Sequence, residues 1–247
     1  MKINNALKEV LNSRMYENAR GTVFNSPKEI LTPLIDMLTP YVDDDNYRIK
    51  NTVGSINRND DDSANIAYDK LIVEFELNIG GFAAEYSNMC VVFDLSGKKA
   101  LYKVAAGHTI RTCLNMCISS DNDLFVSEDT VKINKKLLQY LDEIHNRDRE
   151  YLVFKEHLEN RELNTDKLHQ SLGQIVYNTD SKVLRNFVID SLGEFKNSKS
   201  NYYIEGEKTN LWNVYNCITQ QMSNKFNKSY LDYPSLTLEL RNQIILN

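Results

Sequence analysis

Apolar residues recur every three or four positions from residue 127 onward, which is the spacing of helices with one buried face. The clearest case runs from residue 209 to residue 226, with Thr209 as the expected cap. Its predicted buried face holds five residues: Leu211, Tyr215, Ile218, Met222 and Phe226. Asn and Gln fill many of the other positions. We interpret the helix as docked through its aromatic stripe, and the alternative is that its amides bind a partner or base edges.

Start signals predict the remaining helices. A long charged helix is expected over residues 137–158, with a break near residues 146–148. Another helix is predicted between the Ser-Pro start signal at residues 26–27 and Pro40, which ends it. Three further helices are expected to begin at capping residues: Thr165, Ser181 and Ser235.

Alternation of apolar and polar residues predicts strands in the first half of the chain. The predicted strands cover residues 47–53, 71–77, 89–95, 100–106 and 109–119. The turn at residues 96–99 is a hairpin signal. We therefore predict an α+β fold, with an antiparallel sheet of four or five strands between residues 46 and 119 and a mostly helical C-terminal half. The predicted regions are 1–126 and 127–247, as two domains or packed as one.

Composition and charge narrow the classes of function. The 247 residues carry 29 basic and 34 acidic side chains, giving a net charge of −5. Proteins that coat nucleic acid indiscriminately are usually basic, although a local basic groove is compatible with this balance. No apolar run of about 18 residues is present, so we expect no transmembrane helix and no membrane partner. Four Cys make no disulfide framework, and we expect a cytoplasmic protein.

Signatures of catalysis are missing from the sequence. It contains no Gly-x-Ser-x-Gly turn and no glycine-rich phosphate loop. Cys113 and Cys117 share a strand face near His108, but a zinc site needs a second pair of ligands, so we interpret them as buried side chains. A metal-dependent nuclease using Asp60 to Asp62 and Asp69 is the remaining enzymatic alternative, and solvated turns explain these acids more simply. We predict no enzyme, no cofactor and no metal.

A basic patch is the best candidate site. Lys98, Lys99, Lys103 and Arg111 lie in a segment without Asp or Glu. Lys99 and Lys103 share a strand face, which suits a phosphate backbone, and nearby Tyr residues could stack on bases. The predicted nucleic-acid-binding set adds two residues of the first strand, on condition that this strand lies adjacent: Arg48 and Lys50. An ordinary solvated sheet face is the competing interpretation.

Two segments resemble a known family. They are Arg111-Thr-Cys-Leu-Asn-Met-Cys117 and Leu211-Trp212-Asn213-Val214-Tyr215-Asn216-Cys217-Ile218-Thr219. Together they are similar to the Arg…Cys-Thr-Asn and Leu-Trp-x-x-Tyr-Asn-x-x-Thr motifs of the phage/plasmid-like proteins of unknown function, from about residue 65 to about residue 235. The chain departs from the motif at Leu114, where Thr is usual. The resemblance implies an origin in a bacteriophage or mobile DNA, and hence the host cytoplasm, and assigns no mechanism.

Two functional hypotheses follow. The first is a non-enzymatic phage accessory protein that associates with nucleic acid, as an oligomeric single-stranded DNA-binding or annealing factor. The alternative is an interaction protein that inhibits or redirects a host protein, such as a defence system. The acidic net charge and the acidic runs favour the second hypothesis, whereas the basic hairpin favours the first.

Overall fold

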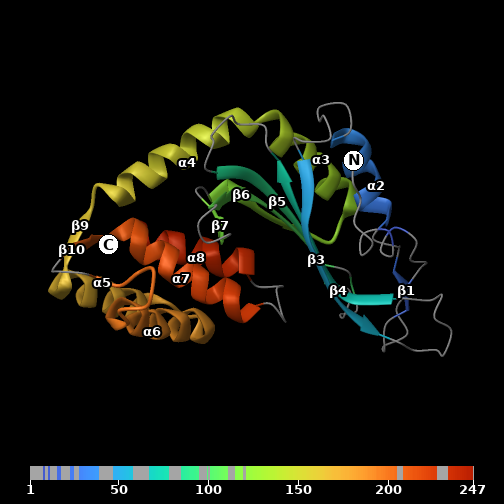
Figure 1. Ribbon diagram of the computed structural model, residues 1–247. Coiled ribbons are helices and arrows are strands. Elements are labelled where there is room, and N and C mark those ends of the chain that lie inside the picture. The colour runs from blue at the N-terminus through green and yellow to red at the C-terminus, as the bar shows by residue number, and fades with distance from the viewer. Residues whose placement is uncertain are drawn as a thin grey trace. The chain divides into compact units, whose positions relative to one another are not determined.

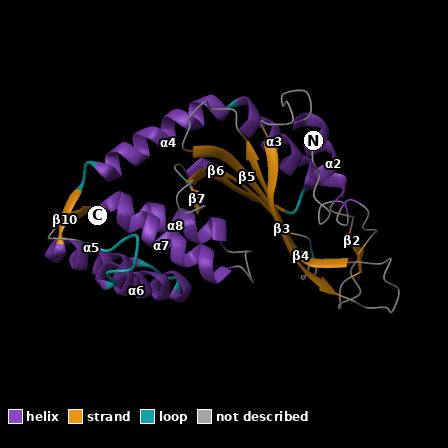
Figure 2. Ribbon diagram, viewed as in Figure 1, coloured by secondary structure: helices purple, strands orange, loops and turns teal. Residues whose placement is uncertain are grey.

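The computed structural model has an antiparallel sheet followed by a mostly helical C-terminal half, which confirms the predicted α+β class (Figures 1 and 2). It describes residues 8, 11, 16–17, 23–24, 28–38, 47–57, 67–77, 85–94, 99, 101–110, 115–118, 121–204, 208–226 and 233–246. The chain forms two compact units. The first contains Met1–Gly107 and Asn122–His145, and the second contains His108–Asp121 and Asn146–Asn247.

Antiparallel pairing organises the first unit. Its main strands are β3 (Tyr47–Asn57), β4 (Ala67–Leu77), β5 (Glu85–Asp94), the first part of β6 (Leu101–Ile110) and β8 (Leu124–Ser127). The order is β3-β4-β5-β6, and β8 pairs with β6 on the edge away from β5. The short strands β1 (Tyr16–Glu17) and β2 (Val23–Phe24) pair with each other. Four of the predicted strands overlap β3 to β6.

Burial explains why the centre of this sheet is so apolar. Five successive β5 residues, from Met89 to Phe93, are all buried. Because neighbouring side chains of a strand point to opposite faces, both faces of β5 are removed from water there. Phe93 meets Tyr102 of β6 edge to face, with ring centroids 5.9 Å apart. An uninterrupted apolar run is what a strand covered on both faces requires.

Two helices complete the first unit. The predicted helix after residue 27 is confirmed as α2 (Lys28–Leu38), which contains Pro33. It contacts α3 (Thr130–Asp142), which also contacts β8. The Asp129 side chain caps α3 by accepting from the backbone N–H groups of Val131 and Lys132. Because of these contacts α3 groups with the sheet, so the two units divide the chain differently from the expected boundary at residue 127.

The second unit is mainly helical. Its helices are α4 (Ile144–Glu159, from Asn146 onward), α5 (Thr165–Asn178), α6 (Lys182–Lys196), α7 (Leu211–Phe226) and α8 (Tyr233–Ile245). α7 contacts α6, α8 and the strand β7 (Asn115–Cys117). The strands β9 (Glu162–Asn164) and β10 (Lys208–Asn210) pair antiparallel. The predicted stripe of α7 is confirmed where side chains are described, because Leu211, Tyr215, Ile218 and Met222 are buried.

Two predicted elements need correction. The expected single strand over residues 109–119 is wrong: β6 continues to Ile110, and β7 pairs back with Asn115 opposite Ile110. The break predicted near residues 146–148 of the long helix lies earlier, because α3 stops at Asp142 and α4 starts at Ile144. Long stretches of apolar periodicity do not fix the residue at which one helix gives way to the next.

Capping was predicted with mixed success. Ser181 is confirmed as the cap of α6, and its side chain accepts from the Leu184 N–H at 3.1 Å. α5 is capped by Asn164 rather than by Thr165, and Asn210 rather than Thr209 accepts from the Asn213 N–H at 2.9 Å in the first turn of α7. In both corrected cases an Asn adjoins the expected Thr, one residue before it at Asn164 and one residue after it at Asn210, and Asn is the stronger cap.

Replacement of Ser181 with Ala should lower the free energy of unfolding by about 1 kcal/mol, because an N–H group at the start of α6 loses its acceptor. The measurement is urea unfolding followed by circular dichroism. Ser198→Ala is the matched control, since Ser198 is exposed in the turn after α6. Equal unfolding midpoints for the two variants would show that the Ser181 hydroxyl does not stabilise α6.

Candidate functional site

The positive charge of the predicted basic hairpin is partly compensated by a carboxylate, that of Glu128. The Lys99 Nζ atom lies 2.8 Å from the Glu128 Oε2 atom, and the two side chains are 75% and 55% exposed. The register explains this contact: β8 pairs antiparallel with β6, with Ser127 opposite Tyr102, so the end of β8 reaches the start of β6. The hydrogen bond with Glu128 raises the pKa of Lys99. A carboxylate therefore stands beside the cation proposed to meet phosphate.

The structure does not bring the other predicted basic residues together with Lys99 in one patch of described residues. Lys103 is half-buried on β6 and lies opposite Val126 of β8. Lys98 and Arg111 lie outside the described residues. Arg48 and Lys50 lie on β3, which is separated from β6 by β4 and β5, so the condition that their strand lies adjacent is not met. At about 4.8 Å between neighbouring strands, β3 and β6 are about 14 Å apart.

A buried His–Asp pair lies in the second unit. The His108 Nε2 atom is 2.6 Å from the Asp148 Oδ1 atom, and the side chains are only 4% and 6% exposed. The pair joins the end of β6 to the first turns of α4 across 40 residues of sequence. The His108 Nδ1 atom is also buried and has no hydrogen-bond partner among the described residues. The pairing of two groups this deeply buried is what makes their burial tolerable.

Aromatic rings extend this pair into α7. The Tyr151 ring stacks on His108, with centroids 4.1 Å apart, and meets Trp212 at 6.2 Å. Trp212 stacks on Tyr215 at 5.8 Å, and Phe154 meets Tyr215 edge to face at 5.6 Å. We call these four residues and His108 the aromatic cluster: His108, Tyr151, Phe154, Trp212 and Tyr215. The Tyr215 hydroxyl also accepts from the Ile118 N–H at 3.3 Å, which ties α7 to the residue after β7.

The neighbourhood of His108 is unsuited to thiol chemistry. Cys117 lies opposite His108 in the β6–β7 register, so a Cys–His–Asp series is present in outline. Both residues are buried, however, and the His108 Nδ1 atom makes no hydrogen bond to a described group, whereas a nucleophile must contact its base and its substrate. Elsewhere in the unit, on α7, burial raises the pKa of the Cys217 thiol to about 12, which keeps it protonated at neutral pH. We interpret the His108–Asp148 pair as structural.

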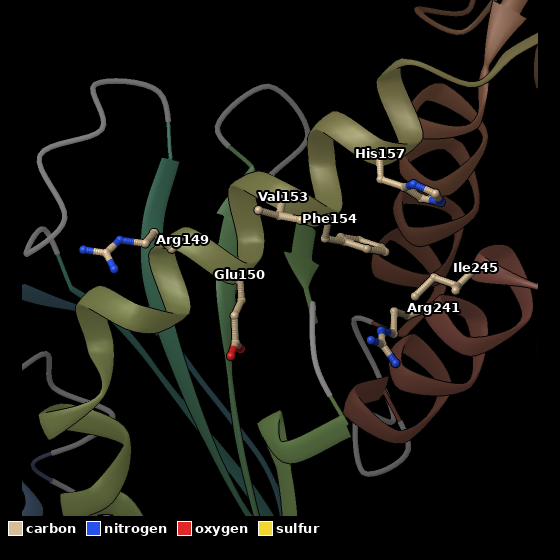
Figure 3. Close-up of a pocket in the computed structure, with 7 residues that line it drawn as sticks. All are labelled: Arg149, Glu150, Val153, Phe154, His157, Arg241 and Ile245. Carbon is tan, nitrogen blue, oxygen red and sulfur yellow. The ribbon is translucent and has the colours of Figure 1, made fainter.

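A cavity of about 600 Å³ opens between α4 and α8 in the same unit (Figure 3). Its α4 wall consists of Arg149, Glu150, Val153, Phe154 and His157, and its α8 wall includes Arg241 and Ile245. In Figure 3 the Phe154 and His157 side chains point from α4 toward α8, and Arg149 extends away from α8 at the other end of the row. The lining surface is mainly apolar, and we call its three charged residues, Arg149, Glu150 and Arg241, the margin. Concave apolar surfaces with a few polar groups are the usual form of binding sites.

The margin carries two positive charges and one negative charge, which favours the binding of anionic groups. Arg149 and Arg241 are cationic, and Glu150 is the one carboxylate of the lining. Burial lowers the pKa of Arg147 on the neighbouring face of α4, and the Glu150 carboxylate opposes that shift. The charge of Glu150 is therefore partly balanced from within α4. The apolar floor and this positive margin are the properties that a ligand would meet.

Sequence reasoning missed both the aromatic cluster and the cavity. The aromatic stripe of α7 was predicted, and Trp212 and Tyr215 belong to it. Nothing in the sequence paired His108 with Asp148, however, and Arg241 carried no signal. Among the described residues, no three His, Cys, Asp or Glu side chains come together as a metal site would require. Within the same ranges, none of the helices has the length and hydropathy to cross a membrane.

Comparison with known proteins matched no family model, no curated protein and no solved structure. The resemblance to the phage/plasmid-like proteins therefore stays a prediction from the two motifs. In the structure, Asn115 and Cys117 of the first motif form part of β7, and the second motif forms the first turns of α7. β7 and α7 are in contact, so these parts of the two motifs come together in the second unit.

Replacement of Asp148 with Ala should lower the free energy of unfolding by about 3 kcal/mol, because it leaves the buried His108 Nε2 atom without its carboxylate. Urea unfolding measures the loss, and Asp180→Ala, at an exposed loop position, is the control. Replacing both His108 and Asp148 with Leu should lower the free energy of unfolding by less than the sum of the losses for His108→Leu and Asp148→Leu. Additive losses would mean that the two side chains are not energetically coupled.

Proposed function

We propose that this protein is a non-enzymatic interaction factor and that it captures a partner protein in the cavity between α4 and α8. The observation that carries this proposal is the exposure of apolar side chains on both walls. Val153 of α4 is 67% exposed and Ile245 of α8 is 36% exposed, while Phe154 contributes to the lining between them. Single exposed apolar residues are ordinary, but apolar residues on facing walls of a cavity favour a binding surface.

The energetics suit capture of a side chain rather than a large flat contact. Burial of an apolar side chain contributes about 1.5–3 kcal/mol. A partner that inserts one such anchor also covers Val153 and Ile245, which removes their exposed surface from water. Interfaces typically draw most of their affinity from a few anchors of this kind, placed in pockets and surrounded by polar groups. The margin formed by Arg149, Arg241 and Glu150 supplies such polar surroundings.

The family resemblance supports a host protein as the partner. A protein encoded by a phage or mobile element meets the proteins of the host cell, and its net charge of −5 suits a protein that competes for partners rather than one that coats DNA. In this proposal the chain inhibits or redirects a host factor, such as a component of a defence system. The proposal requires no chemistry at the buried His108–Asp148 pair, which holds α4 in place.

Val153→Asp should abolish partner capture, because it places a charge against the apolar floor of the cavity. Tagged protein is expressed in a bacterial host, purified with its bound proteins and compared with a Val183→Asp variant. Val183 is 47% exposed on α6 and is not part of the cavity lining, so its replacement matches the chemistry at a different place. Proteins retained by wild type and by Val183→Asp but lost from Val153→Asp identify the partner. A set of bound proteins that is the same for all three would refute the assignment of this cavity.

A second candidate function is binding of single-stranded DNA at the start of β6. The exposed Lys99 side chain, with Lys103 four residues further along, favours it, and the Lys99–Glu128 contact weakens it. Exposed ion pairs contribute about 0–1 kcal/mol, so Glu128 lowers the local positive potential without removing Lys99 from solvent. Annealing of two strands would further require several copies of the chain, as the prediction of a homo-oligomer supposes.

A salt series of gel shifts with a single-stranded oligonucleotide tests this second function. If it is correct, replacement of both Lys99 and Lys103 with Glu abolishes binding and reduces the dependence of affinity on salt. Glu128→Gln should strengthen binding up to about fivefold at low salt, because it removes the carboxylate beside Lys99. No shift at low salt, or shifts that none of these changes affects, would rule out this surface as a DNA-binding site.

A further inference from the structure

The α4 wall of the cavity has a regular order of charges. Arg149, Val153 and His157 follow at intervals of four residues in the order basic, apolar, basic, and each is turned about 40° around the helix axis from the one before. The interval from Arg149 to His157 is eight residues, which corresponds to about 12 Å along the axis. Phe154 lies beside Val153 in the middle of this row. The apolar part of the wall is thus flanked by a nitrogen-bearing side chain on each side.

The side chains at the two ends of this row, Arg149 and His157, are available to a ligand. Arg149 and His157 are both exposed, and neither forms an ion pair with another described residue. A guanidinium group binds a carboxylate with two parallel hydrogen bonds, and an imidazole N–H donates one. Glu150 is the only acid in the lining, and it already interacts with the buried Arg147. An incoming carboxylate at either end therefore meets a donor rather than a second carboxylate.

The same features disfavour nucleic acid at this place. A phosphate backbone carries a negative charge at every nucleotide and would pass Glu150 between the two basic ends. The middle of the wall presents Val153, which offers no face for stacking, and Phe154 is already held against Tyr215. A peptide places its charges only where its sequence has them. It can therefore leave the middle apolar and put its acids at the ends.

We infer that the cavity binds an amphipathic helix of the partner protein that carries an apolar anchor with a carboxylate four residues before it and another four residues after it. This inference rests on the proposed function and specifies the chemistry of the partner. The partner's acid–apolar–acid row repeats the spacing of Arg149, Val153 and His157 with the opposite charge. A helix is the expected form, since the site lies between two helices and helix grooves accept a third helix through residues spaced by three and four.

The experiment uses two synthetic helical peptides of about 15 residues, a length at which alanine-rich helices become stable. Both carry a central leucine. One has glutamate four residues before and four residues after it, and the other has lysine at those two positions. Binding of the labelled peptides to the full chain is measured by fluorescence anisotropy. Trp212, the only Trp, gives a second readout, because Tyr215 contacts both Trp212 and the cavity residue Phe154.

The glutamate peptide should bind about tenfold more tightly than the lysine peptide at low salt. The double variant Arg149→Glu with His157→Glu should reverse this preference, and Lys182→Glu, an exposed position on α6, should leave it unchanged. Reversal is a readout that general destabilisation cannot produce. Equal affinity for the two peptides, an unchanged preference in the double variant, or displacement of the glutamate peptide by oligothymidine would overturn the inference.

The peptide result and the capture experiment separate the two proposals. If Val153→Asp loses a partner but wild type does not prefer the glutamate peptide, the cavity binds a protein of different chemistry and this inference is wrong. If the preference and its reversal are found but capture does not depend on Val153, the site chemistry stands and the proposed capture of a host protein fails.

Discussion

The contact between His108 and Asp148 is the constraint on which the second unit depends most. It places a turn of α4 against the end of β6, and the Tyr151 ring, one turn later on α4, stacks on the same imidazole. From Tyr151 the rings of Trp212 and Tyr215 continue the packing into α7, and the Tyr215 hydroxyl returns to the backbone after β7. Three segments that are distant in sequence are thereby fixed by one polar pair and a series of ring contacts.

Regular local signals explain which parts of this fold could be predicted. The stripe of α7 and the Ser181 cap depend on residues within a few positions of each other, and both were correct. The caps of α5 and α7 were wrong by one residue, because Asn and Thr stand side by side and both accept hydrogen bonds from a first turn. Local chemistry thus predicted these three helix starts to within one residue, whereas α8 begins at Tyr233, two residues before the expected cap Ser235.

The candidate site could not be predicted in the same way, because it depends on pairings across the sequence. His108 and Asp148 are 40 residues apart, and the Ile118–Tyr215 contact spans 97 residues. The basic patch illustrates the same limit. Lys99 and Lys103 share a predicted strand face, but only the β6–β8 register brings Glu128 beside Lys99, and only the strand order separates Arg48 and Lys50 from them. Periodicity indicates which side chains share a face of a strand, but it does not indicate which strands lie beside that strand.

Phe154 connects the stability of the second unit with its proposed activity. Its ring is buried against Tyr215 and also contributes to the lining of the cavity, whereas Val153, the adjacent residue, is largely exposed. Adjacent residues of a helix point about 100° apart, so α4 presents one side to the aromatic cluster and the next side to the cavity. Because Phe154 is fixed by the cluster, the cavity has a preformed floor. A preformed floor reduces the entropy lost when a partner binds, which is the condition under which a few anchor contacts give specific binding.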